Sequence, residues 1–266
     1  MGESGFAAAH AIARAFVDAR RAGQAITAYP GPAPQTLADA YAVQDAAMAH
    51  DGRAVGGWKL GRINPPHLER LGANRLAGPI FTDQIVEVAA GESVAMPIFR
   101  DGFGAAEAEF LLRIGTAPEA GKADYDVATA TALIDAVHAG IEIASSPYPR
   151  INEDGPSVTV SDYGNNNGLV IGAAIAGWRD ADLNAWPLEF IINGEVIGTG
   201  KGADMLDGPF GAAAFLFNLA ARRGIALAPG QWISSGAVTG VHPVAIGDRV
   251  EARFDGRYPV LATITG

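Results

Sequence analysis

Two segments near the start of the chain carry apolar residues at the spacing of a helix. In residues 5–22 the apolar positions lie three and four residues apart, and two arginines follow in the last turn. This pattern predicts an amphipathic helix that buries one face. A second helix is predicted over residues 37–50, with Thr36 at its start as the N-cap. Residues 30–34, rich in proline and glycine, link the two helices.

Short apolar runs bounded by turn residues dominate the rest of the chain and predict strands. The strands are expected over residues 58–61, 79–81, 85–88, 107–114, 137–145, 169–174, 188–192, 196–199, 232–234, 250–254 and 260–265, with a turn at Pro65-Pro66 and helices over residues 125–136 and 211–223. Asn193-Gly194 between two strands is a strong hairpin signal. We expect an α+β protein with an N-terminal helical region that includes one short strand (residues 1–75) and a β-rich domain (residues 76–266).

Composition and charge narrow the function classes. With 266 residues, 49% of them hydrophobic and 18% charged, the chain is typical of a folded globular protein. The net charge of −10 argues against a nucleic-acid partner, whose phosphates need a basic surface. The absence of cysteine excludes a disulfide, a thiolate nucleophile and a cysteine-ligated zinc. Neither a signal peptide nor an apolar run of membrane-spanning length is recognisable, so a cytoplasmic location without membrane contact is expected.

Three glutamates in predicted strands form a candidate metal site. Glu107 and Glu109 are two residues apart in one strand, so their side chains point to the same face. Glu142 stands between two isoleucines in another apolar run, which indicates burial. A buried carboxylate is costly unless it is paired or binds a cation, and three hard oxygen ligands suit Mg²⁺ or Mn²⁺. The alternative is that Glu107 and Glu109 line a solvated face and Glu142 pairs with an arginine.

Six short motifs occur in a fixed order between residues 36 and 250. They are Asp39–Gln44, Gly57–Gly61, Glu107–Glu109, Asp162–Gly172, Gly198–Gly200 and Gly230–Gly240. In this order the chain resembles the fumarylacetoacetate hydrolase superfamily, and its length and helical N-terminal region favour the branch of 2-keto-4-pentenoate hydratases and 4-oxalocrotonate decarboxylases. The resemblance implies a mixed β-sandwich or roll of the type of that superfamily's C-terminal domain. It also implies a divalent metal, Mg²⁺ or Mn²⁺, held here by Glu107, Glu109 and Glu142.

The resemblance further implies three candidate catalytic residues. Lys59 falls where the family has an active-site lysine, which would neutralise an enolate or exchange protons; the alternative is a surface lysine. Asp83 matches an acidic position that in the family often has two carboxylates, but here the pair reads Thr82-Asp83, so Asp83 as a turn residue is the alternative. Asn165 replaces the usual serine of a family loop, where its amide could hold water or an oxyanion; a turn rich in asparagine and glycine is the alternative.

Three further residues are candidates for substrate binding. Asp162 opens the same loop as Asn165, Gly236 allows close approach of the backbone, and Thr239 could bind a substrate carboxylate. Lys201 is a lesser candidate for contact with an anion. Residues 67–69 lie where hydrolases of the superfamily carry a His–Glu pair on a lid; because residues two apart on a helix do not share a face, we expect a mobile lid there rather than a dyad.

The branch acts on 2-oxo or 2-enol carboxylates. We expect a metal-dependent hydratase, a lyase that adds water to a 2-hydroxyalka-2,4-dienoate and gives a 4-hydroxy-2-oxo acid. The alternatives are a 2-oxo-3-enedioate decarboxylase, an acylpyruvate-type hydrolase, and a partner subunit with a degenerate site. The resemblance also implies a homo-oligomer, in which association with a pathway decarboxylase or aldolase is an option.

Overall fold

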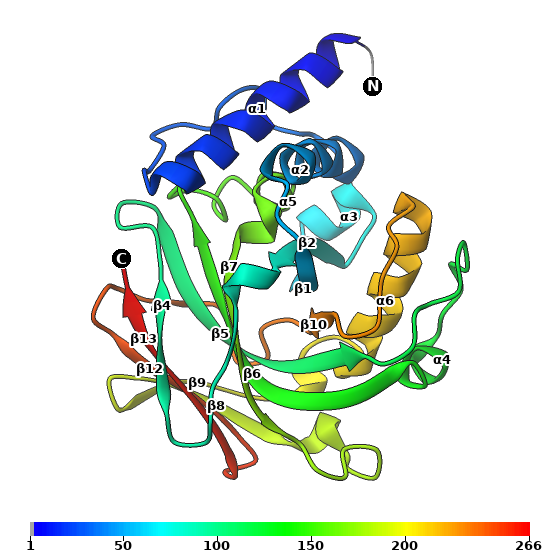
Figure 1. The fold of residues 1–266 in the computed structure, drawn as a ribbon, viewed down its shortest axis with the longest axis vertical. Coiled ribbons are helices and arrows are strands. Elements are labelled where there is room, and N and C mark those ends of the chain that lie inside the picture. Colours follow the sequence, from blue (N-terminus) through cyan, green and yellow to red (C-terminus); the bar gives the residue numbers. More distant parts are fainter. Residues whose placement is uncertain (1–2) are drawn as a thin grey trace.

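The two predicted N-terminal helices form a layer at one end of the molecule (Figure 1). In this computed structural model, which describes residues 3–266, they are α1 (Glu3–Ala22) and α2 (Leu37–Asp51). Apolar side chains of both helices, among them Phe16 and Val43, share one buried cluster. Thr36 accepts a hydrogen bond from the backbone N–H of Asp39, as expected of an N-cap, and Gly52 ends α2 in the left-handed conformation.

An eight-stranded mixed sheet forms the centre of the molecule. Its strands run in the order β2-β1-β10-β5-β6-β7-β3, and β11 pairs with β5. Their bounds are β1 Val55–Arg62, β2 Arg75–Phe81, β3 Ile85–Glu87, β5 Phe103–Ile114, β6 Ile134–Ser146, β7 Asn166–Ala174, β10 Trp232–Ser234 and β11 His242–Pro243. β1 runs parallel to β10 and β3 parallel to β7, whereas the other pairs are antiparallel.

A second, five-stranded sheet packs on the large one. Its order is β4-β13-β12-β8-β9, with β4 Ser93–Pro97, β8 Pro187–Ile192, β9 Glu195–Lys201, β12 Arg249–Phe254 and β13 Tyr258–Thr265. Phe110 and Ile141 of the large sheet share the main apolar cluster with Phe254 and Val260 of the small one. The expected α+β architecture with a mixed β-sandwich is therefore confirmed. Asn193 and Gly194 form the predicted hairpin turn between β8 and β9, both with positive φ.

Helix α6 (Gly208–Arg223) covers part of the large sheet and agrees with the prediction, but the helix predicted over residues 125–136 is wrong in extent. Only α4 (Val127–Thr131) is helical, and Ile134 already begins β6. Ile134, Val137 and Ala139 are buried, while Asp135 between them is exposed. The apolar positions follow the sheet surface at this end of β6, and pairing with β5 overrides the local helical tendency.

Within residues 3–75, β1 belongs to the large sheet, where it is hydrogen-bonded between β2 and β10. The division of the chain at residue 75 stays a prediction. Two short helices, α3 (His67–Leu71) and α5 (Pro156–Ser161), and a 3₁₀ turn, η2 (Tyr163–Asn165), lie between the N-terminal layer and the sheet. Within residues 3–266 no helix is both long enough and apolar enough to cross a membrane.

Candidate metal and substrate site

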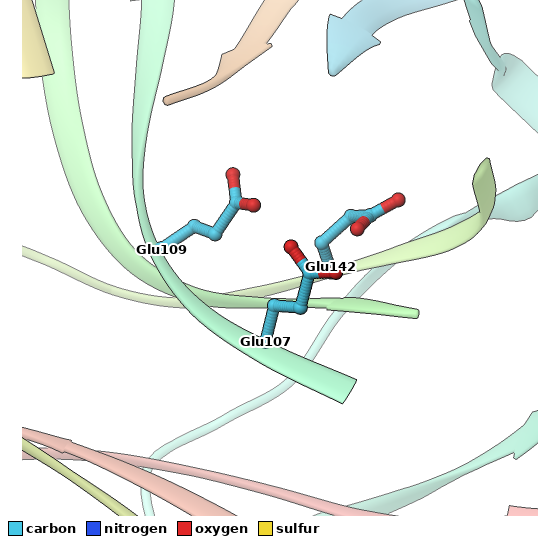
Figure 2. Close-up of side chains that lie close together, drawn as sticks. All are labelled: Glu107, Glu109 and Glu142. Atoms are coloured by element: carbon cyan, nitrogen blue, oxygen red, sulfur yellow. The ribbon is translucent and has the colours of Figure 1, made fainter. Parts of the chain in front are cut away.

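The three predicted glutamates meet on one face of the large sheet. Glu107 and Glu109 lie on β5, and Glu142 lies directly opposite Glu107 on the antiparallel neighbour β6. All three are buried, and one oxygen from each carboxylate lies within 4.8 Å of the others. Figure 2 shows the three carboxylates converging on one region above the strands. The same-face prediction for Glu107 and Glu109 is confirmed, and the alternative of a solvated face is wrong because both residues are buried. Glu142 lies beside a lysine, Lys59, and not beside an arginine.

The burial of this cluster makes its ionisation costly. Burial raises the pKa of Glu109 well above its ordinary value, and the charges of Glu107 and Glu142 raise it further. Burial likewise raises the pKa of Glu142 to about 7, although the charge of Lys59 opposes the rise. Like charges that face each other across a strand pair are destabilising, so three ionised glutamates need more positive charge than one lysine supplies.

The hydrogen bonds around the carboxylates leave one oxygen open on each of two glutamates. The Oε2 atom of Glu109 accepts from the Ser234 hydroxyl and, at 2.7 Å, from the Gly236 backbone N–H. Asn166 Nδ2 donates to Glu142 Oε1 at 2.7 Å. Among the described residues, Glu109 Oε1 and Glu142 Oε2 have no hydrogen-bond partner although they are buried. The only cation close to Glu142 Oε2 among the described residues is the Lys59 ammonium, at 3.4 Å. A carboxylate that is oriented through one oxygen and has few partners at the other is suited to ligate a hard divalent cation.

Lys59 on β1 is the cation nearest to the glutamates. Its Nζ lies 3.4 Å from Glu142 Oε2 and donates to the side-chain oxygen of Asn165 at 3.2 Å. The alternative of a surface lysine is wrong, because only 4% of the side chain is exposed. Burial alone would lower the pKa of Lys59, but the charges of the three glutamates outweigh this effect and raise it. The neighbouring carboxylates thus favour the charged form of Lys59.

Asn165 reaches Lys59 from a turn with an unusual backbone. Tyr163, Gly164 and Asn165 have φ angles of 57°, 64° and 58°, in the left-handed region. This region costs about 1–2 kcal/mol for each residue with a Cβ, and such cost is typical of functional sites. The turn packs closely on Gly78 of β2, where an added Cβ would lie 1.9 Å from the Tyr163 carbonyl oxygen.

A cavity of about 740 Å³ opens from this cluster to the surface. Lys59, Glu107, Asn165 and Thr239 line it, so the structure brings these four predicted site residues together. Polar residues from other segments share the lining, namely Arg62, Asn64, His67, Asn152, Thr159, Thr199 and Asp204. His67 on α3 faces the cavity, whereas Glu69 on the same helix is exposed and is not part of the lining.

The other predicted residues lie apart from the cavity lining. Asp83 has a side chain that is 61% exposed and lies 3.5 Å from Arg53. Asp162 is fully buried and pairs with Arg20 at 2.6 Å. Gly236 contributes its backbone N–H to Glu109, at a φ of 107° that favours glycine. Lys201 is exposed on the edge strand β9.

Three supporting residues were not predicted. Ser234 is a polar residue in a buried strand, a signal that could have been used. Asn152 accepts a hydrogen bond from Asn165 Nδ2 at 3.0 Å, and nothing in its local sequence indicates this contact. Arg20 was predicted only as part of a basic helix end, yet its side chain is buried against the loop that carries Asn165.

Without added metal, the free energy of unfolding should fall as the pH rises between the ordinary pKa of a glutamate and the raised pKa of Glu142. The pKa of Glu142 is about 7 in the folded state against an ordinary value of 4.5. Between these two pKa values the folded chain keeps a proton that the unfolded chain has released. The contribution of protonated Glu142 to the free energy of unfolding is therefore fully present below pH 4.5 and is lost as the pH rises through about 7. In a chelator, the Tm of the wild type should fall relative to that of Glu142→Gln by about 5 °C or more between about pH 4.5 and 7.5. Parallel pH profiles of the two proteins would contradict this expectation.

Comparison with known proteins gives relatives of two kinds, although no family model matches the chain. A 4-oxalocrotonate decarboxylase of Pseudomonas sp. strain CF600 is 34% identical over 131 residues, which are 49% of this chain and 49% of that protein. The matched segment thus spans about half the length of that relative. A 2-keto-4-pentenoate hydratase of Burkholderia vietnamiensis is 31% identical over 234 residues, which are 85% of each chain.

Solved structures show the same fold. The 4-oxalocrotonate decarboxylase of Pseudomonas putida G7, complexed with magnesium and adipate, superposes with a TM-score of 0.79 at 24% identity, covering 96% of this chain and 97% of the other. Fumarylpyruvate hydrolase of Pseudomonas aeruginosa, in complex with Mn²⁺ and pyruvate, gives a TM-score of 0.57 at 15% identity over 78% of this chain and 88% of the other. With the hydratase match over most of its length, the chain belongs to the fumarylacetoacetate hydrolase superfamily, in the branch that contains the 2-keto-4-pentenoate hydratases and 4-oxalocrotonate decarboxylases.

Proposed function

We propose that this chain is a divalent-metal-dependent hydratase that adds water to a 2-hydroxyalka-2,4-dienoate and gives a 4-hydroxy-2-oxo acid. The observation that carries the proposal is the cluster of Glu107, Glu109 and Glu142 beside the buried Lys59 at the cavity. The similarity to hydratases over 85% of the chain supports the same reaction. The two relatives matched by sequence, a hydratase and a decarboxylase, are both lyases, because such enzymes cleave or form bonds without hydrolysis or redox change.

The proposed cofactor is Mg²⁺ or Mn²⁺, held by Glu107, Glu109 and Glu142. When bound, such a cation would supply Lewis-acid polarisation of the substrate's 2-oxygen and carboxylate. Glu109 Oε1 and Glu142 Oε2, which are buried and accept no hydrogen bond among the described residues, support this assignment, as does the raised pKa of both groups. Glutamate oxygens at a buried site are the ligands that these cations prefer.

Lys59, Asn165 and Thr239 would act on the substrate. In the proposed reaction the dienol releases its O–H proton and C5 gains one. The oxygen of water then bonds to C4 and keeps one proton, and the other proton of that water is balanced by the proton added at C3. The Lys59 ammonium stabilises negative charge on the 2-oxygen and is the nearest proton donor. Asn165 fixes the position of that ammonium through its side-chain oxygen. Thr239, also in the cavity lining, is the proposed contact of the substrate carboxylate.

Decarboxylation of a 2-oxo-3-enedioate is the second candidate. It is supported by the 34% identity to a 4-oxalocrotonate decarboxylase and by Arg62 and His67 in the cavity lining, which could hold a second carboxylate. A panel of 2-oxo and 2-enol acids, with Mg²⁺ or Mn²⁺, followed by product mass separates the candidates. Gain of water supports the proposal, loss of CO₂ favours the decarboxylase, and cleavage would favour an acylpyruvate-type hydrolase. If the chain binds metal but turns over none of these acids, the remaining alternative is that it is a partner subunit with a degenerate site.

The proposal extends to assembly. The resemblance to this branch implies a homo-oligomer, for which association with a pathway decarboxylase or aldolase is an option. Size-exclusion chromatography with light scattering tests the oligomer, and co-elution with a purified 4-oxalocrotonate decarboxylase tests the association. A single monomer peak in both experiments would remove this part of the proposal.

Replacing Asn165 should separate catalysis from turn chemistry. Asn165→Gly removes the amide but suits the left-handed backbone at this position, so the Tm should change little. Because the hydrogen bond to Lys59 is lost, kcat should fall about tenfold, while the metal affinity stays that of the wild type. An Asn165→Gly enzyme with unchanged kcat would assign this residue to the turn alone.

A further inference from the structure

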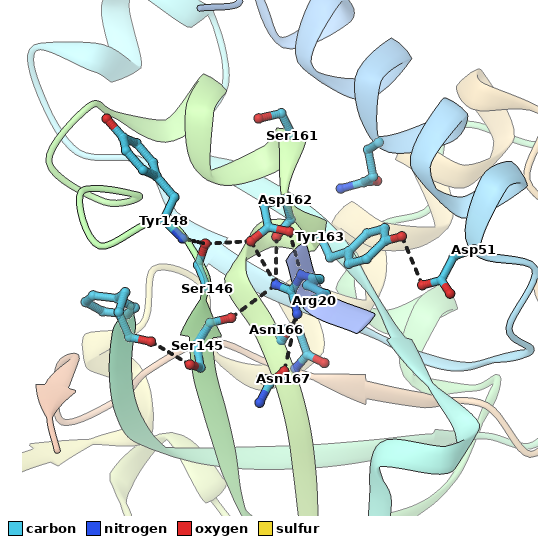
Figure 3. Close-up of polar contacts among 12 residues, drawn as sticks. Arg20, Asp51, Ser145, Ser146, Tyr148, Ser161, Asp162, Tyr163, Asn166 and Asn167 are labelled. Atoms are coloured by element: carbon cyan, nitrogen blue, oxygen red, sulfur yellow. Dashed lines mark hydrogen bonds and ion pairs between the residues drawn. The ribbon is translucent and has the colours of Figure 1, made fainter. Parts of the chain in front are cut away.

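Arg20, at the end of α1, is a buried cation with an unusual number of partners. Its side chain is only 6% exposed. Nε and Nη2 donate to the two carboxylate oxygens of Asp162 at 2.6 and 2.9 Å, a bidentate pair. The guanidinium lies near the rings of Phe99 and Tyr163, at 5.5 and 5.1 Å from their centroids. Figure 3 shows Arg20 with dashed lines to Asp162 and to neighbouring residues of β6 and β7.

The same guanidinium also holds the far end of the turn. Nη1 donates to the backbone carbonyl of Asn166 at 3.1 Å and to the side-chain oxygen of Asn167 at 3.2 Å. Asp162 and Asn166 flank the three residues in the left-handed region, Tyr163 to Asn165. One side chain therefore binds both ends of a turn whose backbone conformation L residues rarely adopt. Asp162 is fixed from a second side, because the Ser146 hydroxyl donates to it at 2.6 Å.

The residues that this turn carries contact the candidate site directly. Asn165 accepts a hydrogen bond from Lys59, and Asn166 donates to Glu142. Docking of α1 does not need Arg20, because Ile12, Phe16 and Val17 already bury the apolar face of that helix. The hydrogen bonds of the Arg20 guanidinium to the distant loop are therefore not needed to attach α1 to the protein.

We propose that Arg20 is a positioning residue. By binding Asp162 and the Asn166 carbonyl together, it holds the turn in its strained form and so sets the Asn165 amide on Lys59 and the Asn166 amide on Glu142. Loss of the guanidinium lets the turn relax, which weakens both contacts at once. The part of this inference that concerns turnover rests on the proposed function, whereas the part that concerns the turn does not.

The test compares Arg20→Met and Arg20→Lys with Arg14→Met. Arg14 lies on the exposed face of the same helix and makes no hydrogen bond or ion pair among the described residues, so it matches the change in charge. Amide hydrogen exchange is measured over residues 162–167, and Mg²⁺ affinity by calorimetry. In both Arg20 variants the amide hydrogens of residues 162–167 should exchange at least about tenfold faster than in the wild type. Both variants should also bind Mg²⁺ several-fold more weakly, while Arg14→Met behaves as the wild type does. Exchange that matches Arg14→Met would overturn the proposal.

A double-mutant cycle with Asn165→Gly gives the second measurement. If Arg20 acts through the turn, Arg20→Met should lower kcat about tenfold in the wild type but less than about threefold in Asn165→Gly, because the contact is already lost there. If Arg20→Met lowers kcat by the same factor in the wild type and in Asn165→Gly, the role of Arg20 is merely structural. The same holds if Arg20→Met keeps the kcat of the wild type but has a lower Tm. If Arg20→Met does not fold, Arg20→Lys carries the cycle. If the wild type turns over none of the acids, the proposed function fails, and hydrogen exchange alone decides the role of Arg20.

Discussion

Glu109→Gln should weaken the binding of Mg²⁺ or Mn²⁺ by at least about tenfold, roughly 1.4 kcal/mol, and should abolish turnover. Glu109 is fully buried, one of its oxygens is fixed by Ser234 and Gly236, and the other has no partner among the described residues. Glutamine keeps the shape and one acceptor but replaces an anionic ligand with a neutral amide. Isothermal titration calorimetry measures the affinity, and turnover is followed with and without chelator.

The controls for this prediction exclude a folding defect. Removing a buried carboxylate whose pKa is raised should leave the metal-free Tm unchanged or higher. Glu87→Gln, on an exposed position of β3, should bind metal as the wild type does. Metal binding by Glu109→Gln equal to that of the wild type would remove Glu109 from the site.

Lys59→Met should lower kcat on the order of a hundredfold at saturating metal, the low end of the range for general acid–base catalysis. The ammonium lies 3.4 Å from Glu142 and hydrogen-bonds Asn165, so it stands where charge on a substrate would develop. Methionine retains the packing of the aliphatic stem. Lys59 is the nearest cation to three buried carboxylates, so the metal-free variant should be less stable than the wild type at neutral pH, and bound metal should offset this loss.

Steady-state kinetics and thermal unfolding with and without Mg²⁺ check this prediction. Lys122→Met, which lies outside the cavity lining, provides the matched loss of one lysine. A Lys59→Met enzyme of wild-type activity would end the catalytic role, and a variant that stays unfolded in saturating Mg²⁺ would make Lys59 a residue of the fold.

The cluster of three glutamates could be predicted because its signal is local. The spacing of Glu107 and Glu109 sets a common face in any strand, and the isoleucines around Glu142 indicate burial. The register that places Glu142 opposite Glu107 could not be predicted in this way, because it depends on the pairing of β5 with β6. The same holds for the surroundings of Lys59, since its partners Asn165 and Glu142 come from β7's loop and from β6.

For Asp162, the contact expected from the resemblance differs from the contacts in the structure. The resemblance suggests that Asp162 contacts the substrate. In the structure the Asp162 carboxylate accepts hydrogen bonds from Arg20 of α1 and Ser146 of β6. No pattern within residues 162–168 could indicate a partner from the first helix. The helix predicted over residues 125–136 failed for a similar reason, because the pairing of β6 with β5 decides the conformation of residues 134–136.

The parallel pairing of β1 with β10 bears on the order of events during synthesis. Residues 57–59 pair with residues 232–234, and Ser234 and Gly236 then hold Glu109. Contacts between such distant segments slow folding, because the loop between them must close first. On the ribosome, the strand that carries Lys59 has to wait for the last part of the chain before it gains this neighbour. A chain released early, before β10 has been made, would therefore expose the edge of β5 to other chains and would lack the two groups that orient the Glu109 carboxylate.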